Sequence, residues 1–221
     1  MIKCCIFDLD GTILDTINTI TYFVNITLER YGISPVTDEE CKYFAGCGAK
    51  SLIKSALASK NISVSDEKFC EIFNFYKSSY DANPLYLTSV FPGIRELLSE
   101  LKSSGVRLAV LSNKPDFAVR SIIESFFGGV FDAVRGAVDG VPLKPSASAA
   151  LEIIKDLSVK PSECAWIGDT KTDVETGKNL GVSLNVGVLW GFRKEDELRL
   201  AGADFIAESA EDILKEIRIA R

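Results

Sequence analysis

Phe7-Asp8-Leu9-Asp10-Gly11-Thr12 is the stretch that decides the fold of this 221-residue chain. It follows residues 2–6, Ile-Lys-Cys-Cys-Ile, a short and mostly apolar run that predicts a strand buried on both faces. Asp8 and Asp10 come where this strand ends, and Gly11 lets the backbone turn sharply. Ligands bind at the carboxyl ends of the strands in open α/β sheets. The sequence therefore predicts a functional edge of a sheet at Asp8.

The two carboxylates of this stretch are compatible with chemistry on phosphorus. Carboxylates at the edge of a core are costly to bury unless they are paired or bound to a cation. Asp8 could act as a nucleophile toward phosphorus and form an aspartyl-phosphate, with a hard cation such as Mg²⁺ holding the anionic substrate against it. The alternative is a strand followed by an Asp-Gly turn with two solvated acids. The short stretch by itself leaves both interpretations open.

Helical periodicity covers the part of the chain that follows Thr12. Apolar residues recur there at intervals of three to four positions, as on a helix with one buried face. Helices are expected over residues 17–31, 38–44, 49–59 and 66–81. No strand is expected between Asp15 and Leu85. We therefore expect residues 15–84 to form an all-helical domain inserted into the rest of the chain.

Strands and helices alternate from Val90 onward. The expected strands cover residues 106–111, 131–134, 164–168, 183–189 and 204–207. The expected helices cover residues 93–104, 115–127, 146–157, 173–180 and 210–219. Such alternation predicts a parallel sheet flanked by helices with right-handed crossovers. The fold class is therefore α/β, with a Rossmann-like core built from residues 1–14 and 85–221.

The composition limits the classes of protein to which the chain can belong. Its 47% hydrophobic and 25% charged residues are ordinary for a globular protein. A formal net charge of −6 argues against nonspecific nucleic-acid binding, which depends on clustered Lys and Arg. No apolar run approaches the roughly 20 residues that a membrane-spanning helix needs. Because the first residues enter a strand without a secretory signal, we expect a cytoplasmic protein with no membrane partner.

Cysteine spacing and the lack of histidine exclude several mechanisms. The six cysteines form no Cys-x-x-Cys pair, and the chain has no histidine, so zinc-site and redox-motif spacing is absent. Without histidine, neither a Ser-His-Asp nor a Cys-His mechanism is available. Acid–base chemistry must come from carboxylates, Lys, Tyr or Cys.

Three later segments place further polar groups at strand ends or helix starts. Ser112 follows an expected strand, Lys144 precedes an expected helix, and Asp169 ends a strand in Gly168-Asp169-Thr170-Lys171-Thr172-Asp173. Taken one by one, they also fit a Ser-Asn turn, a solvated lysine and a helix cap. Lys114 is expected to be a solvated surface residue, with a substrate contact as the alternative.

The four segments together resemble the four motifs of the haloacid-dehalogenase superfamily of phosphohydrolases. Asp8-Leu9-Asp10-Gly11-Thr12 resembles the first motif, and Ser112, Lys144 and residues 168–173 match the second, third and fourth in order. The resemblance covers nearly the whole chain and implies a core of that superfamily's type with residues 15–84 as a helical cap. Ala147 departs from the family pattern, which often has a second proline at that position.

The resemblance also implies a role for each matching residue. Asp8 would be the nucleophile, and Asp10 would protonate the leaving oxygen and then activate water. Ser112 and the backbone N–H of Asn113 would bind phosphoryl oxygens, and Lys144 would neutralise the charge of Asp8 and the phosphoryl group. The metal ligands would be Asp8, Asp10 (through its backbone carbonyl), Asp169 and Asp173, with Asp173 also able to orient metal-bound water or Lys144.

Within the superfamily, the chain is most similar to phosphoglycolate-phosphatase-type proteins. Ala45-Gly46-Cys47-Gly48-Ala49-Lys50 resembles their cap segment, and its N–H groups at a helix start would favour an anion. The expected substrate contacts are Gly11, Thr12, Gly46, Gly48, Lys50 and Asn113. Asp10 argues against a dehalogenase, because dehalogenases of the superfamily lack an acidic residue at that position of the motif.

The expected activity is Mg²⁺-dependent hydrolysis of a small phosphorylated metabolite, with 2-phosphoglycolate as the first candidate. A pyrophosphatase or a β-phosphoglucomutase-like phosphomutase of the same fold is the alternative. A noncatalytic phospho-acceptor module resembling receiver domains would be much shorter and would lack a cap. The sequence leaves a monomer and a homodimer equally open.

Overall fold

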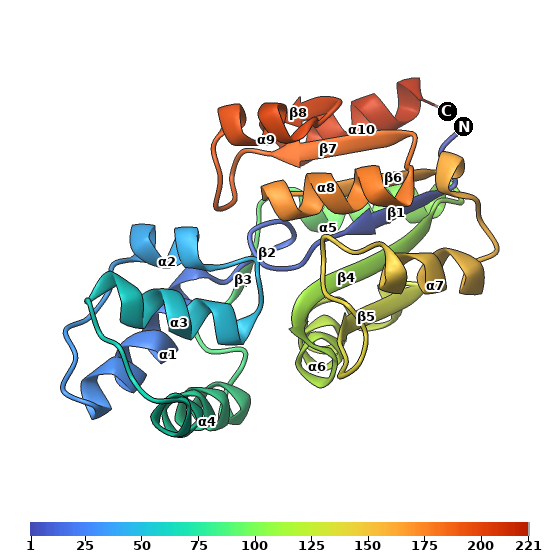
Figure 1. Ribbon diagram of the computed structural model, residues 1–221. Coiled ribbons are helices and arrows are strands. Elements are labelled where there is room, and N and C mark those ends of the chain that lie inside the picture. The colour runs from blue at the N-terminus through green and yellow to red at the C-terminus, as the bar shows by residue number, and fades with distance from the viewer. Residues whose placement is uncertain (221) are drawn as a thin grey trace. The chain divides into compact units, whose positions relative to one another are not determined.

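The structure is a computed structural model, and it describes residues 1–220 (Figure 1). Its main sheet has the order β5-β4-β1-β6-β7-β8, and every neighbouring pair is parallel. The strands are β1 Cys4–Phe7, β4 Arg107–Pro115, β5 Ala133–Ala137, β6 Cys164–Gly168, β7 Leu184–Val188 and β8 Phe205–Ala207. The predicted α/β fold with a parallel sheet is confirmed.

Strand β1 lies between β4 and β6, and its four residues are all buried. Its side chains alternate between the two faces of the sheet. Cys5 and Phe7 belong to one hydrophobic cluster, and Cys4 and Ile6 belong to another. Both faces of β1 therefore need apolar residues, which explains the nearly continuous apolar run at the start of the chain.

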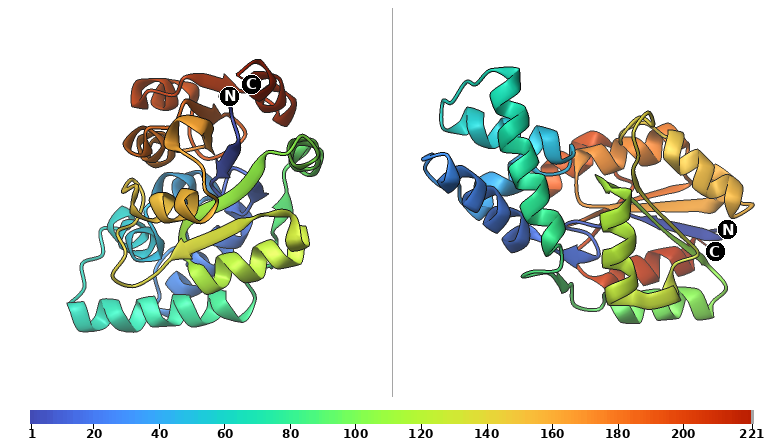
Figure 2. Two further views of the ribbon diagram at one scale, coloured as in Figure 1. Left: turned by 90° about the vertical axis from the view of Figure 1, so that its right-hand side faces the viewer. Right: turned by 90° about the horizontal axis from the view of Figure 1, so that it is seen from below.

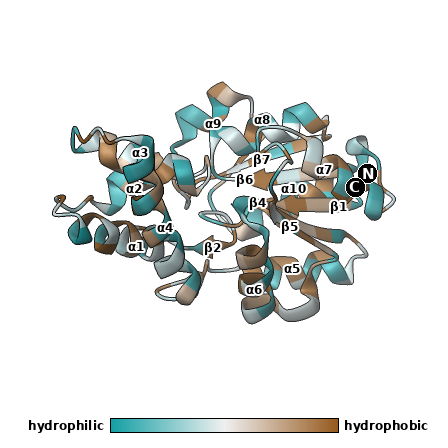
Figure 3. Ribbon diagram, turned by 60° about the horizontal axis from the view of Figure 1, so that its bottom comes forward, coloured by the Kyte–Doolittle hydropathy of each residue, from teal (hydrophilic) through white to brown (hydrophobic). Residues whose placement is uncertain are grey.

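Helices cover both faces of the main sheet, as the views in Figure 2 show. Helices α5 Ile94–Ser103, α6 Asp116–Phe127 and α10 Ala210–Ile219 contribute to the cluster that contains Phe7. Helices α7 Ser148–Asp156 and α8 Lys171–Leu180 contribute to the cluster on the other face, and α9 Glu195–Ala201 packs on α8. Two short 3₁₀ helices, η1 Gly128–Val130 and η2 Pro161–Glu163, precede β5 and β6. Hydrophobic residues concentrate on the strands in Figure 3, as expected for a three-layer core.

The chain divides into two compact units, Met1–Asp15 with Val90–Arg221 and Thr16–Ser89. We refer to them as the core unit and the helical unit. The chain leaves and re-enters the core unit next to two short paired strands, β2 Leu14–Asp15 and β3 Ser89–Val90. The assignment of residues 15–84 as a cap stays a prediction.

The helical unit contains α1 Ile17–Arg30, α2 Asp38–Phe44, α3 Ala49–Ser59 and α4 Asp66–Ala82. The Thr37 hydroxyl and the Glu40 carboxylate form a capping box at the start of α2, and the Ser65 hydroxyl caps α4. All six tyrosines of the protein lie in the helical unit, whereas both tryptophans, Trp166 and Trp190, lie in the core unit. Among residues 1–220, no helix combines the length and the apolar character needed to cross a bilayer.

Several element boundaries differ from the sequence-based expectations. Strand β4 continues through Ser112 and Lys114 to Pro115, because pairing with β5 resumes at Pro115 and Ala137 after a register shift. Helix α8 starts at Lys171, since Thr170 caps it in a capping box. Helix α9 and the two-residue strands β2 and β3 were not expected; their short lengths leave little periodicity to detect.

Candidate active site

A buried ionic cluster lies at the carboxyl end of β1. The Lys144 ammonium lies 2.6 Å from Asp8 Oδ1 and 2.7 Å from Asp173 Oδ1. The side chains of Lys144, Asp8 and Asp173 are only 3%, 9% and 1% exposed. One lysine thus bridges two carboxylates that come from opposite ends of the sequence.

Backbone contacts hold Lys144 in this position. The Asn113 side chain accepts a hydrogen bond from the Lys144 N–H at 2.8 Å and donates one to the Lys144 carbonyl at 3.2 Å. Asn113 lies in β4, next to β1 in the sheet. Asp173 is fixed separately, since its Oδ2 accepts hydrogen bonds from the Thr170 N–H at 3.1 Å and the Thr170 hydroxyl at 2.5 Å.

Asp169 lies at the end of β6 and is fully buried. Its Oδ1 accepts a hydrogen bond from the Thr12 hydroxyl at 2.9 Å, and its Oδ2 accepts one from the Phe192 N–H at 2.8 Å. Gly11 has a φ of +83°, and a Cβ atom there would lie 2.3 Å from Asp169 Oδ2. The loop after Asp10 therefore needs glycine both for its backbone conformation and for its close approach to Asp169.

The cluster contains more acidic groups than basic groups. Burial raises the pKa of Asp8 to about 7, repulsion from Asp173 adds to this, and Lys144 opposes it. Burial and the charges of Asp173 and Asp8 likewise hold the pKa of Asp169 well above its usual range. Burial lowers the pKa of Lys144, but Asp173 and Asp8 raise it by more, so Lys144 stays charged. The three carboxylates face a single ammonium group.

The three carboxylates fit a divalent cation. Asp8, Asp169 and Asp173 each offer an oxygen, and these oxygens all lie within 4.8 Å of one another. Hard cations such as Mg²⁺ and Ca²⁺ prefer carboxylate and carbonyl oxygens. A cation at this position would also offset the repulsion that raises the pKa values of Asp8 and Asp169.

Asp10 and Lys114 form a second ion pair, with 2.7 Å between Asp10 Oδ1 and Lys114 Nζ. The expectation that Lys114 is a solvated surface residue is wrong, because its side chain is only 8% exposed. The cause is the extra length of β4, which carries the chain through Ser112 and Lys114 instead of turning after Leu111. The sequence analysis did not expect this pairing with Asp10, and the alternative of a substrate contact for Lys114 stays a prediction.

The remaining candidate residues fall into two groups. In the core unit, Ser112 is 4% exposed, and its hydroxyl accepts a hydrogen bond from the Lys114 N–H at 3.2 Å. Gly46, Gly48 and Lys50 belong to the helical unit, where Gly48 caps α3 and the Lys50 ammonium lies 5.8 Å from the centre of the Phe73 ring. The predicted contacts of these residues with substrate stay predictions.

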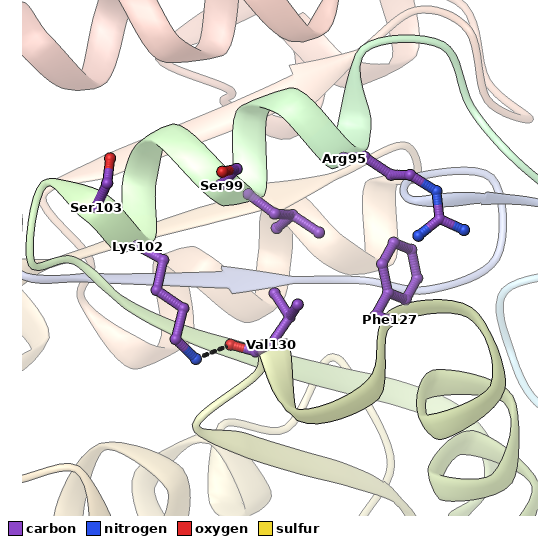
Figure 4. A pocket seen from close by; sticks show the side chains of 7 residues that line it. Arg95, Ser99, Lys102, Ser103, Phe127 and Val130 are labelled. Atoms are coloured by element: carbon purple, nitrogen blue, oxygen red, sulfur yellow. Dashed lines mark hydrogen bonds between the residues drawn. The ribbon is translucent and has the colours of Figure 1, made fainter.

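A cavity of about 330 Å³ elsewhere in the core unit shares no residue with this cluster (Figure 4). It lies between α5 and the end of α6, and its apolar lining residues include Leu98 and Phe127. Both basic side chains that line the cavity already donate hydrogen bonds to backbone carbonyls: Arg95 to Phe126 and Lys102 to Val130. Basic residues often satisfy the last carbonyls of a helix in this way. The cavity is a feature of helix packing.

Comparison with known proteins agrees with the geometry. Residues 5–186 match the family of haloacid dehalogenase-like hydrolases. A phosphoglycolate phosphatase from Aquifex aeolicus is 30% identical over 214 residues, which cover 96% of this chain and 95% of that protein.

Solved structures show the same similarity. A candidate phosphoglycolate phosphatase from Lactobacillus delbrueckii subsp. bulgaricus superimposes with a TM-score of 0.92 at 33% identity, covering 97% of this chain and 98% of that one. A candidate β-phosphoglucomutase from Thermotoga maritima shares the fold, with a TM-score of 0.74 at 23% identity and full coverage of both chains. The protein therefore belongs to the haloacid dehalogenase-like hydrolases, and within that family it is a phosphatase, a phosphoric monoester hydrolase.

Proposed function

We propose that this phosphatase is Mg²⁺-dependent and hydrolyses a small phosphorylated metabolite through an aspartyl-phosphate on Asp8, with 2-phosphoglycolate as the first candidate substrate. The observation that carries the proposal is the buried cluster in which Lys144 bridges Asp8 and Asp173 beside Asp169. Phosphoryl transfer requires mainly positioning and charge stabilisation, and this cluster supplies both.

Asp8 is the nucleophile in this proposal. One of its carboxylate oxygens attacks phosphorus, the new O–P bond forms, and the bond from phosphorus to the leaving oxygen breaks. The Lys144 ammonium, 2.6 Å from Asp8 Oδ1, stabilises the charge on the carboxylate and on the phosphoryl group. The Ser112 hydroxyl and the Asn113 N–H bind phosphoryl oxygens at the neighbouring strand β4.

Asp10 moves the protons. It donates a proton to the leaving oxygen in the first step and removes one from water in the second. In that second step the water oxygen bonds to phosphorus, the bond between the Asp8 oxygen and phosphorus breaks, and inorganic phosphate leaves while the Asp8 carboxylate is regenerated. Its carboxylate lies 2.7 Å from the Lys114 ammonium, which limits the directions in which it can point. Lys114 therefore acts through Asp10 as a positioning residue.

Mg²⁺ is the proposed cofactor. The carboxylates of Asp8, Asp169 and Asp173 and the backbone carbonyl of Asp10 would hold it. When bound, the cation supplies positive charge to the carboxylate cluster and to a phosphoryl oxygen. The excess of three carboxylates over one ammonium group supports this requirement.

The helical unit is proposed to act as the cap that selects small substrates. Gly46, Gly48 and Lys50 would meet the end of the substrate that is distant from the phosphoryl group, where backbone N–H groups at the start of α3 favour a carboxylate. The Gly48 cap leaves the first turn of α3 without a side-chain cap or an acidic residue, which supports an anionic partner. 2-Phosphoglycolate is the first candidate substrate because similar proteins are named phosphoglycolate phosphatase.

One assay series tests the proposal. The purified protein is incubated with p-nitrophenyl phosphate, 2-phosphoglycolate, pyrophosphate, glucose phosphates and a phosphopeptide, with Mg²⁺ or with EDTA. We expect hydrolysis that EDTA abolishes and Mg²⁺ restores, with the highest kcat/KM for 2-phosphoglycolate. Full activity after rigorous metal removal would contradict the cofactor, and efficient hydrolysis of the phosphopeptide would contradict a closing cap.

The same series separates the alternatives. Preference for pyrophosphate would make the protein a pyrophosphatase. Interconversion of glucose phosphates that depends on a sugar bisphosphate activator would make it a phosphomutase, an activity suggested only by the shared fold of the Thermotoga protein.

A further inference from the structure

The turn that follows β7 packs against the Asp169 side of the cluster. Trp190, Gly191 and Phe192 lie between β7 and α9, and none of them was expected from the sequence to take part in the site. Two of the three bond to residues of the site through one group each: the Phe192 N–H and the Trp190 indole N–H.

The turn fixes the Asp169 carboxylate from two directions. The Phe192 N–H donates directly to Asp169 Oδ2 at 2.8 Å. The Trp190 indole N–H donates at 2.9 Å to the carbonyl of Thr12, whose hydroxyl donates to Asp169 Oδ1 at 2.9 Å. Each oxygen of Asp169 thus accepts one hydrogen bond, and the turn provides or supports both donors.

Gly191 brings the turn close enough for these contacts. A Cβ atom at Gly191 would lie 2.3 Å from the Cβ of Asp169 and 2.4 Å from the carbonyl oxygen of Gly11. One is a backbone atom and the other is a Cβ atom, so neither can move away by rotation of a side chain. Any larger residue at this position must displace Asp169, the loop at Gly11 or the turn itself.

We propose that the turn Trp190–Gly191–Phe192 is a positioning element for Asp169 that sets the affinity of the carboxylate cluster for a divalent cation. The proposal rests on the cation site of the proposed function. Groups that orient a metal ligand without touching the metal typically change metal affinity about 10- to 100-fold when they are altered. Asp169 has no ammonium partner of its own among residues 1–220, so its direction depends on these neutral donors.

The test measures Mg²⁺ binding itself by isothermal titration calorimetry on the full chain without substrate. Gly191→Ala should weaken Mg²⁺ binding about 10- to 100-fold. Trp190→Phe keeps an aromatic ring beside Phe91 but loses the indole donor, so it should weaken binding by less. Gly187→Ala is the matched control, because a Cβ there would meet Leu198 and Ile206 side chains at 3.0 Å and nothing of the cluster.

The outcomes distinguish failure of the positioning role of the turn from failure of the cation site itself. Thermal melts show whether each variant is folded, and Gly187→Ala should bind Mg²⁺ as the wild type does. Wild-type affinity in both Gly191→Ala and Trp190→Phe would overturn the positioning role while leaving the cation site intact. An equal loss in Gly187→Ala would overturn it as well, since a general loss of packing would then explain the effect. If the wild type binds no Mg²⁺, the cation site fails and the inference fails with it.

Discussion

The core unit and the helical unit use their charged residues in different ways. In the core unit, Lys144 meets Asp8 and Asp173 where all three side chains are buried. In the helical unit, ion pairs such as Lys68 with Glu71 lie on exposed helix surfaces. Exposed pairs contribute little to stability, whereas buried charges are costly unless they are paired. The buried charges of the core unit therefore indicate chemistry, whereas exposed pairs, which the core unit also has on its surface (Arg218 with Glu100, for example), mostly indicate solvation.

The two units also differ in how their candidate residues are brought together. The core cluster joins residues that are far apart in sequence, such as Lys144 and Asp8, or Trp190 and Thr12, because the carboxyl ends of parallel strands meet at one edge. Gly46, Gly48 and Lys50 are close neighbours at the start of α3. The core residues therefore constrain one another across the sheet, whereas Gly46, Gly48 and Lys50 are placed next to one another by their positions in the sequence.

The largest effect is expected from Asp8→Asn. Covalent catalysis loses its nucleophile, so kcat for p-nitrophenyl phosphate should fall by roughly 10⁴-fold or more. The fold should persist, since the substitution removes a carboxylate whose pKa is raised by burial. Thermal melts and steady-state kinetics measure both effects. Asp66→Asn, on an exposed helix start of the helical unit, is the control and should leave kcat unchanged. Near-normal kcat in Asp8→Asn would refute Asp8 as the nucleophile, and with it the assignment of chemistry to the buried cluster of the core unit.

A smaller loss is expected from Lys114→Met. The substitution keeps the length of the side chain but removes the ammonium group that pairs with Asp10. General acid–base catalysis typically contributes 10²- to 10⁴-fold, so losing the orientation of Asp10 should lower kcat about 10- to 100-fold. Lys114→Arg should restore part of the activity. The control is Lys54→Met, whose ammonium lies over the Phe69 ring of the helical unit. Equal effects at Lys114 and Lys54 would refute the positioning role.

Removal of metal should destabilise the core unit in a pH-dependent way. The folded pKa of Asp8, about 7, lies above its ordinary value of 3.8, so the folded protein retains a proton that the unfolded chain loses between these values. Stability without metal should therefore fall as the pH rises from about 4 to 7. A cation that binds only the folded state offsets this loss.

The increase in melting temperature on adding Mg²⁺ should accordingly be larger above pH 7 than at pH 5, where protonated carboxylates bind the cation less well. Differential scanning calorimetry with Mg²⁺ and with EDTA measures it. Asp169→Asn should reduce the increase at both pH values. An equal increase at both pH values in the wild type would be inconsistent with the raised pKa of Asp8.

The smallest effect is expected from Lys50→Ala in the helical unit. If Lys50 contacts the carboxylate of 2-phosphoglycolate, kcat/KM for this substrate should fall by about 5-fold at most, because exposed charge pairs contribute up to about 1 kcal/mol. Hydrolysis of p-nitrophenyl phosphate, which has no carboxylate, should not change. Lys54→Ala, on the same helix, is the control. A uniform loss across substrates would show that Lys50 supports the helical unit and does not recognise the carboxylate.

Much of the fold and part of the cluster follow from the sequence. Asp8 and Asp169 are predictable because each ends a short apolar strand, and strand ends of a parallel sheet share one edge. Lys144 precedes a helix and could be placed beside them only by its similarity to a family motif. The structure brings these residues together, and their individual roles stay proposals.

What could not be predicted depends on contacts between distant loops. The position of Lys114 follows from a register shift between β4 and β5, which no local pattern reveals. The close approach of Gly191 to Asp169 and Gly11 requires three separate loops to be in place at once. Element boundaries near the cluster were wrong for the same reason, since tertiary pairing extends β4 beyond its apolar run.

The separation of the aromatic residues gives each unit its own fluorophore. Excitation that selects indole rings reports only on the core unit, where Trp190 bonds to Thr12 and Trp166 lies 5.8 Å from the Lys144 ammonium. All the tyrosine rings that absorb light as donors lie in the helical unit. Energy transfer from tyrosine to tryptophan therefore passes from one unit to the other, and its efficiency reports the separation between them. The unmodified protein thus carries an intrinsic donor and acceptor pair with which any movement of the two units during turnover can be followed in solution.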